Sequence, residues 1–154
     1  MGHKQNVEIL LIEDNPDDVA LAVGSLKKGK ISNNVHILKD GAEALDFIFA
    51  QGSSAERSEC EQPQLILLDL NLPKVHGLEV LRKLKGDERT KSIPVIIMTS
   101  AEEERGVMQS YKLGAEGCLM KPFEFSKFIE AISELPLAWL LIDPRTVTQR
   151  KESA

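Results

Sequence analysis

The chain has 154 residues, 42% of them hydrophobic, so we expect a single domain over residues 1–154 with enough apolar material for a core. The formal net charge is −5 and there is no basic block, so the composition does not support nucleic-acid binding. No apolar run reaches the roughly 20 residues that cross a bilayer and residues 1–6 carry no signal-peptide core, so we expect a cytoplasmic protein with no membrane partner.

The first half of the chain predicts two strands, each followed by a helix. A strand at 7–12 leads into a helix that begins at Asn15-Pro16 and ends at Gly29. Asparagine is a favoured N-cap, proline fits the first helical position, and a glycine after two lysines is typical of a helix end. A strand at 35–38 follows, and then a helix from Asp40-Gly41 with apolar residues at helical spacing, namely Ala42, Leu45, Ile48 and Phe49. Residues 51–62 form a long polar connection.

The second half continues the alternation. Four aliphatic residues in a row at 65–68 are typical of a strand buried on both faces. The remaining elements are a helix around residues 78–84, a strand opened by Ile93-Pro94, a helix from Glu102 to Leu113 closed by Gly114, a strand at 117–120, and a helix from Phe125 to Leu135 whose apolar stripe faces the sheet. Strands alternating with helices predict right-handed crossovers and therefore an α/β fold, (βα)5, with a doubly wound five-stranded parallel sheet.

Acids, hydroxyls and a lysine follow four of these strands at the point where each ends. They are Glu13-Asp14, Asp69, Thr99-Ser100 and Lys121. Because the carboxyl ends of parallel strands meet at one edge of a sheet, we expect these side chains to lie together. Neighbouring carboxylates repel unless a cation lies among them, and Mg²⁺ prefers such oxygen ligands. The alternative is that the acids are ordinary loop residues, or that Asp14 caps the next helix.

Asp69 has a second role open to it. A carboxylate can attack phosphorus and form an aspartyl phosphate, a reaction that needs a metal, a cation and hydrogen-bond donors. Lys121 is the candidate cation and Thr99 the candidate hydroxyl donor. Taken singly, Lys121 could be a solvated surface residue, and Thr99 or Ser100 could simply cap the next helix. Their occurrence together, each after an apolar strand, favours the phosphoryl-transfer interpretation.

Five motifs carry a resemblance to a known family. They are Leu-Ile-Glu13-Asp14-Asn, Asp40-Gly-Ala-Glu-Ala-Leu, Leu-Leu-Asp69-Leu-Asn-Leu-Pro, Ile-Pro-Val-Ile-Ile-Met-Thr99-Ser and Tyr111-Lys-Leu-Gly-Ala-Glu-Gly-Cys-Leu-Met-Lys121-Pro122. Residues 7–135 thereby resemble the receiver domain of two-component response regulators, with its flavodoxin-like fold. The resemblance implies that Asp69 accepts a phosphoryl group from a histidine kinase or a phosphotransfer protein, and that Thr99 and Lys121 contact that group. It also implies Mg²⁺ held by Glu13, Asp14, Asp69 and the backbone carbonyl of Asn71, and a cis Lys121-Pro122 bond.

The chain departs from the family at Cys118, where receivers usually carry a tyrosine or phenylalanine that rotates inward on activation. Cysteine is too small for that movement. We therefore expect the signal to pass through shifts of the helix at 102–113 and the strand at 117–120, with Tyr111 as a substitute for the missing ring.

A finer resemblance concerns the kind of receiver. The run Asp69-Leu-Asn-Leu-Pro-Lys74, the long loop before it and the Trp139-containing tail resemble the small regulators paired with phytochromes. Residues 136–154 are too few for an output domain, so we expect a stand-alone receiver. The apolar residues of this tail predict a homodimer formed with the last two helices, although they could instead fold back on their own domain.

Three functions stay open. The first is a phosphorylatable signalling receiver, which needs Glu13, Asp14, Asp69, Thr99 and Lys121, and all five are present. The second is a pseudo-receiver that binds partners without phosphorylation. The third is a metal-dependent phosphohydrolase, which is disfavoured because Asp69-Leu-Asn71 lacks the second aspartate that would act as acid and base. The first is no enzyme in the usual sense, because the protein itself accepts the phosphoryl group.

Overall fold

The computed structural model describes residues 9–29, 35–49, 63–100 and 104–133. Within these residues five strands alternate with five helices, as the sequence predicts. In chain order they are β1 (Ile9–Ile12), α1 (Pro16–Lys28), β2 (Val35–Leu38), α2 (Gly41–Ile48), β3 (Leu65–Asp69), α3 (Gly77–Lys85), β4 (Val95–Thr99), α4 (Glu104–Leu113), β5 (Gly117–Met120) and α5 (Phe125–Ser133). No helix in the described ranges is long and apolar enough to span a membrane.

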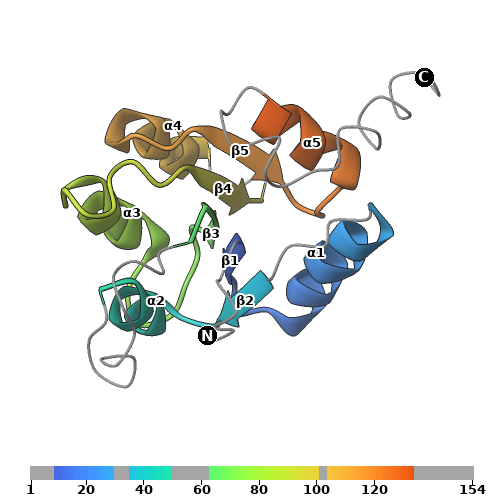
Figure 1. Cartoon of the computed structure of the whole chain (residues 1–154), viewed down its shortest axis with the longest axis horizontal. Coiled ribbons are helices and arrows are strands. Elements are labelled where there is room, and N and C mark those ends of the chain that lie inside the picture. Colours follow the sequence, from blue (N-terminus) through green and yellow to red (C-terminus); the bar gives the residue numbers. More distant parts are fainter. Residues whose placement is uncertain (1–8, 30–34, 50–62, 101–103, 134–154) are drawn as a thin grey trace, which may run out of the picture.

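The strands form one parallel sheet in the order β2-β1-β3-β4-β5, covered by helices on both faces. Helices α1 and α5 lie on one face, and α2, α3 and α4 lie on the other (Figure 1). The predicted doubly wound α/β fold is confirmed. Because the strand order reverses direction between β1 and β3, the carboxyl ends of these two strands open a crevice in which such sheets bind ligands.

The uninterrupted aliphatic strands are explained by the two helical layers. Leu10 and Ile12 of β1 pack into the layer with α2 and α3, whereas Ile9 and Leu11 pack into the layer with α1 and α5. All four side chains are fully buried, as are the four aliphatic residues at the start of β3. Successive side chains point to opposite faces, so a strand covered on both sides has no position left for a polar residue.

The helix ends follow the predicted signals. The Asn15 side chain accepts hydrogen bonds from the backbone N–H groups of Asp17 (2.8 Å) and Asp18 (3.1 Å), which fixes the start of α1. Gly114 follows α4 with φ 112°, a conformation that favours glycine. The predicted cis Lys121-Pro122 bond is also present.

The predicted apolar face of α2 differs from the observed one. The buried residues of this helix include Ala44, Phe47 and Ile48, while the expected Ala42 and Leu45 are only partly buried. The helix carries two adjacent apolar stripes, so spacing alone does not select the one that meets the sheet. The stripe of α5 is confirmed over Phe125 to Ile132. The long connection, the tail after residue 133 and residues 102–103 of the predicted fourth helix lie outside the described residues.

Candidate functional site

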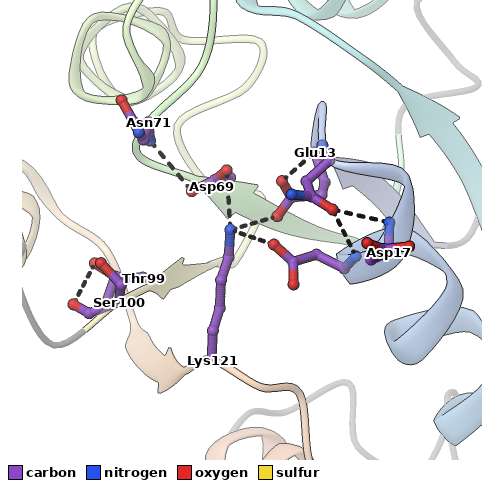
Figure 2. Close-up of polar contacts among 9 residues, drawn as sticks. Glu13, Asp17, Asp69, Asn71, Thr99, Ser100 and Lys121 are labelled. Atoms are coloured by element: carbon purple, nitrogen blue, oxygen red, sulfur yellow. Dashed lines mark hydrogen bonds and ion pairs between the residues drawn. The ribbon is translucent and has the colours of Figure 1, made fainter.

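The side chains singled out by sequence gather at the carboxyl edge of the sheet. Glu13 follows β1, Asp69 ends β3, and Lys121 follows β5. The Lys121 backbone N–H donates to the carbonyl of Thr99 (2.7 Å), which continues the β4–β5 pairing by one residue and fixes where the lysine side chain starts. From there the side chain reaches across the edge toward Asp69 and Glu13 (Figure 2). The expected convergence of Glu13, Asp69 and Lys121 is therefore observed.

The Lys121 ammonium contacts three carboxylates. Its Nζ lies 2.9 Å from Glu13 Oε1, 3.1 Å from Asp18 Oδ2 and 3.2 Å from Asp69 Oδ2. Burial of the lysine lowers the pKa of its ammonium, but the ion pairs with Glu13, Asp18 and Asp69 outweigh that effect and raise the pKa overall. Lys121 is therefore a permanent positive charge at this edge.

Glu13 is buried close to a second carboxylate, that of Asp69. Burial, followed by the neighbouring Asp69 carboxylate, raises the pKa of Glu13 to about 7, although Lys121 and the Asn15 backbone N–H pull it down. Its Oε2 accepts a hydrogen bond from that N–H (3.1 Å). Its Oε1 is buried and, among the described residues, accepts no hydrogen bond of good geometry, although the Lys121 ammonium is close. This edge therefore holds more negative charge than one lysine balances.

The Asp69 carboxylate is held from both sides. Its Oδ1 accepts a hydrogen bond from the Asn71 backbone N–H (3.2 Å), and its Oδ2 pairs with Lys121. The backbone beneath it is held by α3, because the Gly77 N–H donates to the Leu70 carbonyl (2.9 Å). A Cβ at position 77 would lie 2.4 Å from the Asp69 carbonyl oxygen, so only glycine permits this approach. The start of α3 therefore positions the carboxylate at the strand end.

Glu13, Asp14 and Asp69 form a candidate metal centre. One ligand oxygen from each lies within 4.8 Å of the others. A pocket of about 300 Å³ opens beside them, lined by Asp14, Asn15, Asp18, Asp69, Asn71, Ser100 and Lys121. An all-oxygen donor set and an excess of carboxylates over cations suit Mg²⁺, which binds to one or two carboxylates and keeps several waters. The residues therefore fit the predicted ion, and Asn71 lines the same pocket.

Thr99 lies at the same edge but faces elsewhere. It is buried at the end of β4, and its hydroxyl donates to the Ser100 carbonyl (3.2 Å). Figure 2 shows the pair apart from the cluster around Lys121, while Ser100 lines the pocket. The contact between the Thr99 hydroxyl and a phosphoryl group stays a prediction.

Asp18 is a member of the site that sequence reasoning missed. Asp17 and Asp18 are both first-turn acids of the kind that the positive end of a helix dipole favours. The structure separates them, since Asp18 lines the pocket and pairs with Lys121 while Asp17 is exposed and is not among the lining residues. No local sequence signal separates the two acids, because both lie in the first turn of α1.

The region expected to carry the switch lies along β5. Cys118 is half-buried and lines, with Tyr111, Met120 and Lys127 among others, a groove of about 430 Å³ between α4, β5 and α5. Burial, and to a lesser extent the nearby Cys118, raises the pKa of Tyr111. The tyrosine is thus close to the position where an aromatic ring is missing, and its role in switching stays a prediction.

Comparisons with known proteins agree with this arrangement. The family model of the response regulator receiver domain matches residues 9–133. The chain is 37% identical over 132 residues to the response regulator Rcp1 of Synechocystis sp., covering 86% of this chain and 88% of Rcp1. Its fold is similar to that of the bacteriophytochrome response regulator AtBRR, with a TM-score of 0.80, 42% identity and coverage of 91% of this chain and 99% of AtBRR. It is also similar to the Mn²⁺-bound form of Rcp1, with a TM-score of 0.70, 36% identity and coverage of 88% and 94%.

Proposed function

Because this chain belongs to the family of response regulator receiver domains, we propose that its Asp69 accepts a phosphoryl group from a histidine kinase or a phosphotransfer protein. One observation carries the proposal. The Asp69 carboxylate lines an open pocket, and its Oδ2 lies 3.2 Å from the Lys121 ammonium, which also pairs with Glu13 and Asp18. Phosphorylation of Asp69 would then change the surface that the receiver offers to its partners.

In the proposed transfer, one Asp69 carboxylate oxygen attacks the phosphorus of a phosphohistidine. An oxygen–phosphorus bond forms, the phosphorus–nitrogen bond breaks, and the imidazole leaves with the electron pair and takes up a proton. Lys121 then exchanges its contact with Asp69 Oδ2 for one with a phosphoryl oxygen. The Asn71 N–H keeps Oδ1 in place during attack. The protein is the phosphoacceptor in this step and acts on no separate substrate, so we do not classify it as an enzyme.

The acidic residues supply the other half of the site. Glu13, Asp14, Asp69 and the Asn71 backbone carbonyl would hold Mg²⁺, which when bound neutralises charge on the phosphoryl oxygens. Two observations support this assignment, namely the oxygen cluster in this chain and the existence of a Mn²⁺-bound form of the related Rcp1. We therefore expect chelation of divalent cations to prevent phosphorylation.

For the kinase we propose a phytochrome. The support comes from relatives, because two similar structures are those of bacteriophytochrome response regulators, at 42% and 40% identity, and they span most of this chain. Phosphotransfer profiling tests this. A phytochrome kinase should phosphorylate the wild-type protein faster than unrelated kinases do. Equal rates for all kinases tested would contradict a phytochrome as the partner.

The receiver function itself is tested with Mg²⁺ and a small acyl phosphate. A receiver gains about 80 Da in intact-mass spectra, a pseudo-receiver gains nothing, and a phosphohydrolase consumes the donor without a lasting adduct. Asp69→Asn is the control, because it removes the nucleophile while keeping the shape of the side chain. An adduct of equal yield on that variant would place the phosphoryl group elsewhere.

We propose that the protein assembles as a homodimer through α4, α5 and the tail after residue 136. The support is the apolar composition of the tail and the exposed apolar side chains of this region, such as Met108 and Met120. Sedimentation of the chain truncated after Pro136 tests this, because a dimer that needs the tail should lose half its mass. An unchanged mass would refute the role of the tail.

A further inference from the structure

We propose that Asp18 is a positioning residue that competes with the incoming phosphoryl group for the Lys121 ammonium and thereby slows phosphorylation of Asp69. This inference rests on the proposed function and adds a residue of α1 to the groups that set the transfer rate. It is carried by the three-way ion pair of Lys121 and by the place of Asp18 in the first turn of α1.

The contact of Lys121 with Asp18 is as close as its contact with the phosphoacceptor. Nζ lies 3.1 Å from Asp18 Oδ2 and 3.2 Å from Asp69 Oδ2. The two carboxylates come from different elements, so the ammonium is held between the start of α1 and the end of β3. Asp18 also lines the pocket that a phosphodonor must enter. It is therefore placed to act on both the lysine and the donor.

The position of Asp18 does not depend on the lysine. The Asn15 side chain accepts a hydrogen bond from the Asp18 backbone N–H (3.1 Å), and Pro16 begins the helix immediately before it. A carboxylate in the first turn is also favoured by the positive end of the helix dipole. The helix start thus fixes the backbone of Asp18 beside Lys121, so the carboxylate is within reach of the ammonium.

The charges around the ammonium create the competition. Lys121 has three carboxylate neighbours, Glu13, Asp18 and Asp69, within ion-pair distance of its Nζ. A phosphoryl oxygen that approaches the ammonium must therefore compete with the attraction of these acids. Asp18 also adds negative charge to a pocket that must admit a dianionic donor, so both effects slow the reaction.

A pair of matched variants tests the proposal in the full chain. Asp18→Asn removes the competing charge, and Asp17→Asn removes the same charge from the same helical turn at an exposed position outside the pocket. The second-order rate constant for phosphorylation by acetyl phosphate is measured at saturating Mg²⁺. We expect Asp18→Asn to raise it roughly three- to tenfold, since one charge-assisted contact and one repulsive charge are lost, and Asp17→Asn to leave it near the wild-type value.

A second measurement follows the lysine itself. The side-chain NMR signals of Lys121 are assigned by their absence in Lys121→Met. These signals should shift in Asp18→Asn and stay in place in Asp17→Asn. If Asp18 only stabilised the start of α1, both variants would give the same Lys121 signals and the same change in Tm.

The outcomes separate this inference from the proposed function. Equal rate constants for the two variants, a slower reaction of Asp18→Asn, or unchanged Lys121 signals would overturn the role of Asp18 while the wild-type adduct still supported the receiver function. A wild-type protein that acyl phosphates leave unmodified would overturn the proposed function and this inference together.

Discussion

Two lysines stand at opposite ends of the sheet, and their surroundings differ. Lys85, at the end of α3, donates to the carbonyls of Lys91 (3.1 Å) and Ile93 (2.9 Å) and to the Glu116 carboxylate (3.1 Å). Lys121 has three carboxylates around its ammonium. The side chains are 11% and 22% exposed. Both lysines are thus largely buried, and burial does not explain the difference in partners.

The difference lies in the balance of charge. At Lys85 one cation meets one carboxylate and two neutral carbonyls. The Glu116 carboxylate also accepts a hydrogen bond from the Val95 N–H (2.8 Å), so the positive and negative charges balance there. At Lys121 one cation meets an excess of acids, and a buried oxygen of Glu13 accepts no well-aligned hydrogen bond among the described residues. We infer that the first lysine joins α3 to the sheet, while the second belongs to a site that still has capacity for a cation and a phosphoryl group.

The largest expected effect is on phosphorylation, at the edge where Glu13, Asp18 and Asp69 surround Lys121. Asp69→Asn should abolish the acyl phosphate adduct, because an amide is not a nucleophile toward phosphorus, while the cooperative unfolding transition is kept. Intact-mass spectra and thermal unfolding measure the two properties. A lost unfolding transition would mean that Asp69 supports the fold, and the comparison between the two ends would be wrong.

The lysines themselves give the next largest contrast. Lys121→Met should slow phosphorylation roughly 100-fold, since it removes the preorganised charge that faces the phosphoryl group. Lys85→Met should keep the rate within about twofold of wild type but lower the free energy of unfolding by about 2 kcal/mol, since it leaves two backbone carbonyls and the partly exposed Glu116 carboxylate without their donor. Phosphorylation rates and urea unfolding of both variants check this. A slowed reaction of Lys85→Met, together with a normal rate for Lys121→Met, would contradict the roles assigned to the two lysines.

The pH dependence of stability tests the acidic edge without a change to either lysine. In metal-free protein the Glu13 pKa is raised to about 7, so between pH 5 and pH 7 the folded state binds a proton that the unfolded state has released. Stability therefore falls as pH rises through this window, by about 3 kcal/mol relative to Glu13→Gln, which cannot titrate. Urea unfolding across the pH range measures this difference. A difference that stays flat, or rises with pH, would contradict the shift.

Mg²⁺ should abolish this fall in stability with rising pH. If the acids hold the ion, binding to their ionised form stabilises the folded state, and the wild-type protein should lose its decline between pH 5 and pH 7 at saturating Mg²⁺. Lys85→Met serves as the matched control for the other end, because Mg²⁺ should stabilise it as much as wild type and leave the difference in free energy of unfolding between the two unchanged. A difference between Lys85→Met and wild type that closes with Mg²⁺ would show that the ion acts outside the acidic edge.

The smallest expected effect concerns a third lysine. Lys91 pairs with Glu88 at the surface (2.9 Å), and both side chains are mostly exposed. Lys91→Met should change the free energy of unfolding by no more than about 0.5 kcal/mol and leave the phosphorylation rate unchanged, because exposed ion pairs contribute little. A loss as large as that of Lys85→Met would show that burial is not what makes Lys85 important.

The sequence predicts the sheet and the composition of this edge well, for identifiable reasons. Runs such as Leu65 to Leu68 are typical of a strand covered on both sides, and the residues after each run must meet at the carboxyl edge. Asp18 was not predicted as part of the site because it and Asp17 are equivalent as first-turn acids. Their difference depends on the rotation of α1 relative to β5, which no local pattern encodes.

Two other features needed coordinates for the same reason. The buried stripe of α2 is one of two apolar stripes, and contact with the sheet selects Ala44 and Phe47. The role of Gly77 is visible only in the packed structure, where a Cβ at that position would run into the Asp69 backbone. Local propensity therefore locates elements and edges, while tertiary packing decides which neighbouring residue belongs to the site.

We infer that the carboxyl edge of the sheet directs phosphorylation to one carboxylate, that of Asp69. Treating the acyl phosphate-loaded protein with borohydride converts a phosphorylated aspartate to homoserine, and peptide mass spectrometry locates the converted residue. We expect homoserine at position 69 in the wild-type and Lys85→Met proteins, and none when Mg²⁺ is chelated. Homoserine at another aspartate, or its absence from the loaded wild-type protein, would show that Asp69 is not the phosphorylated residue.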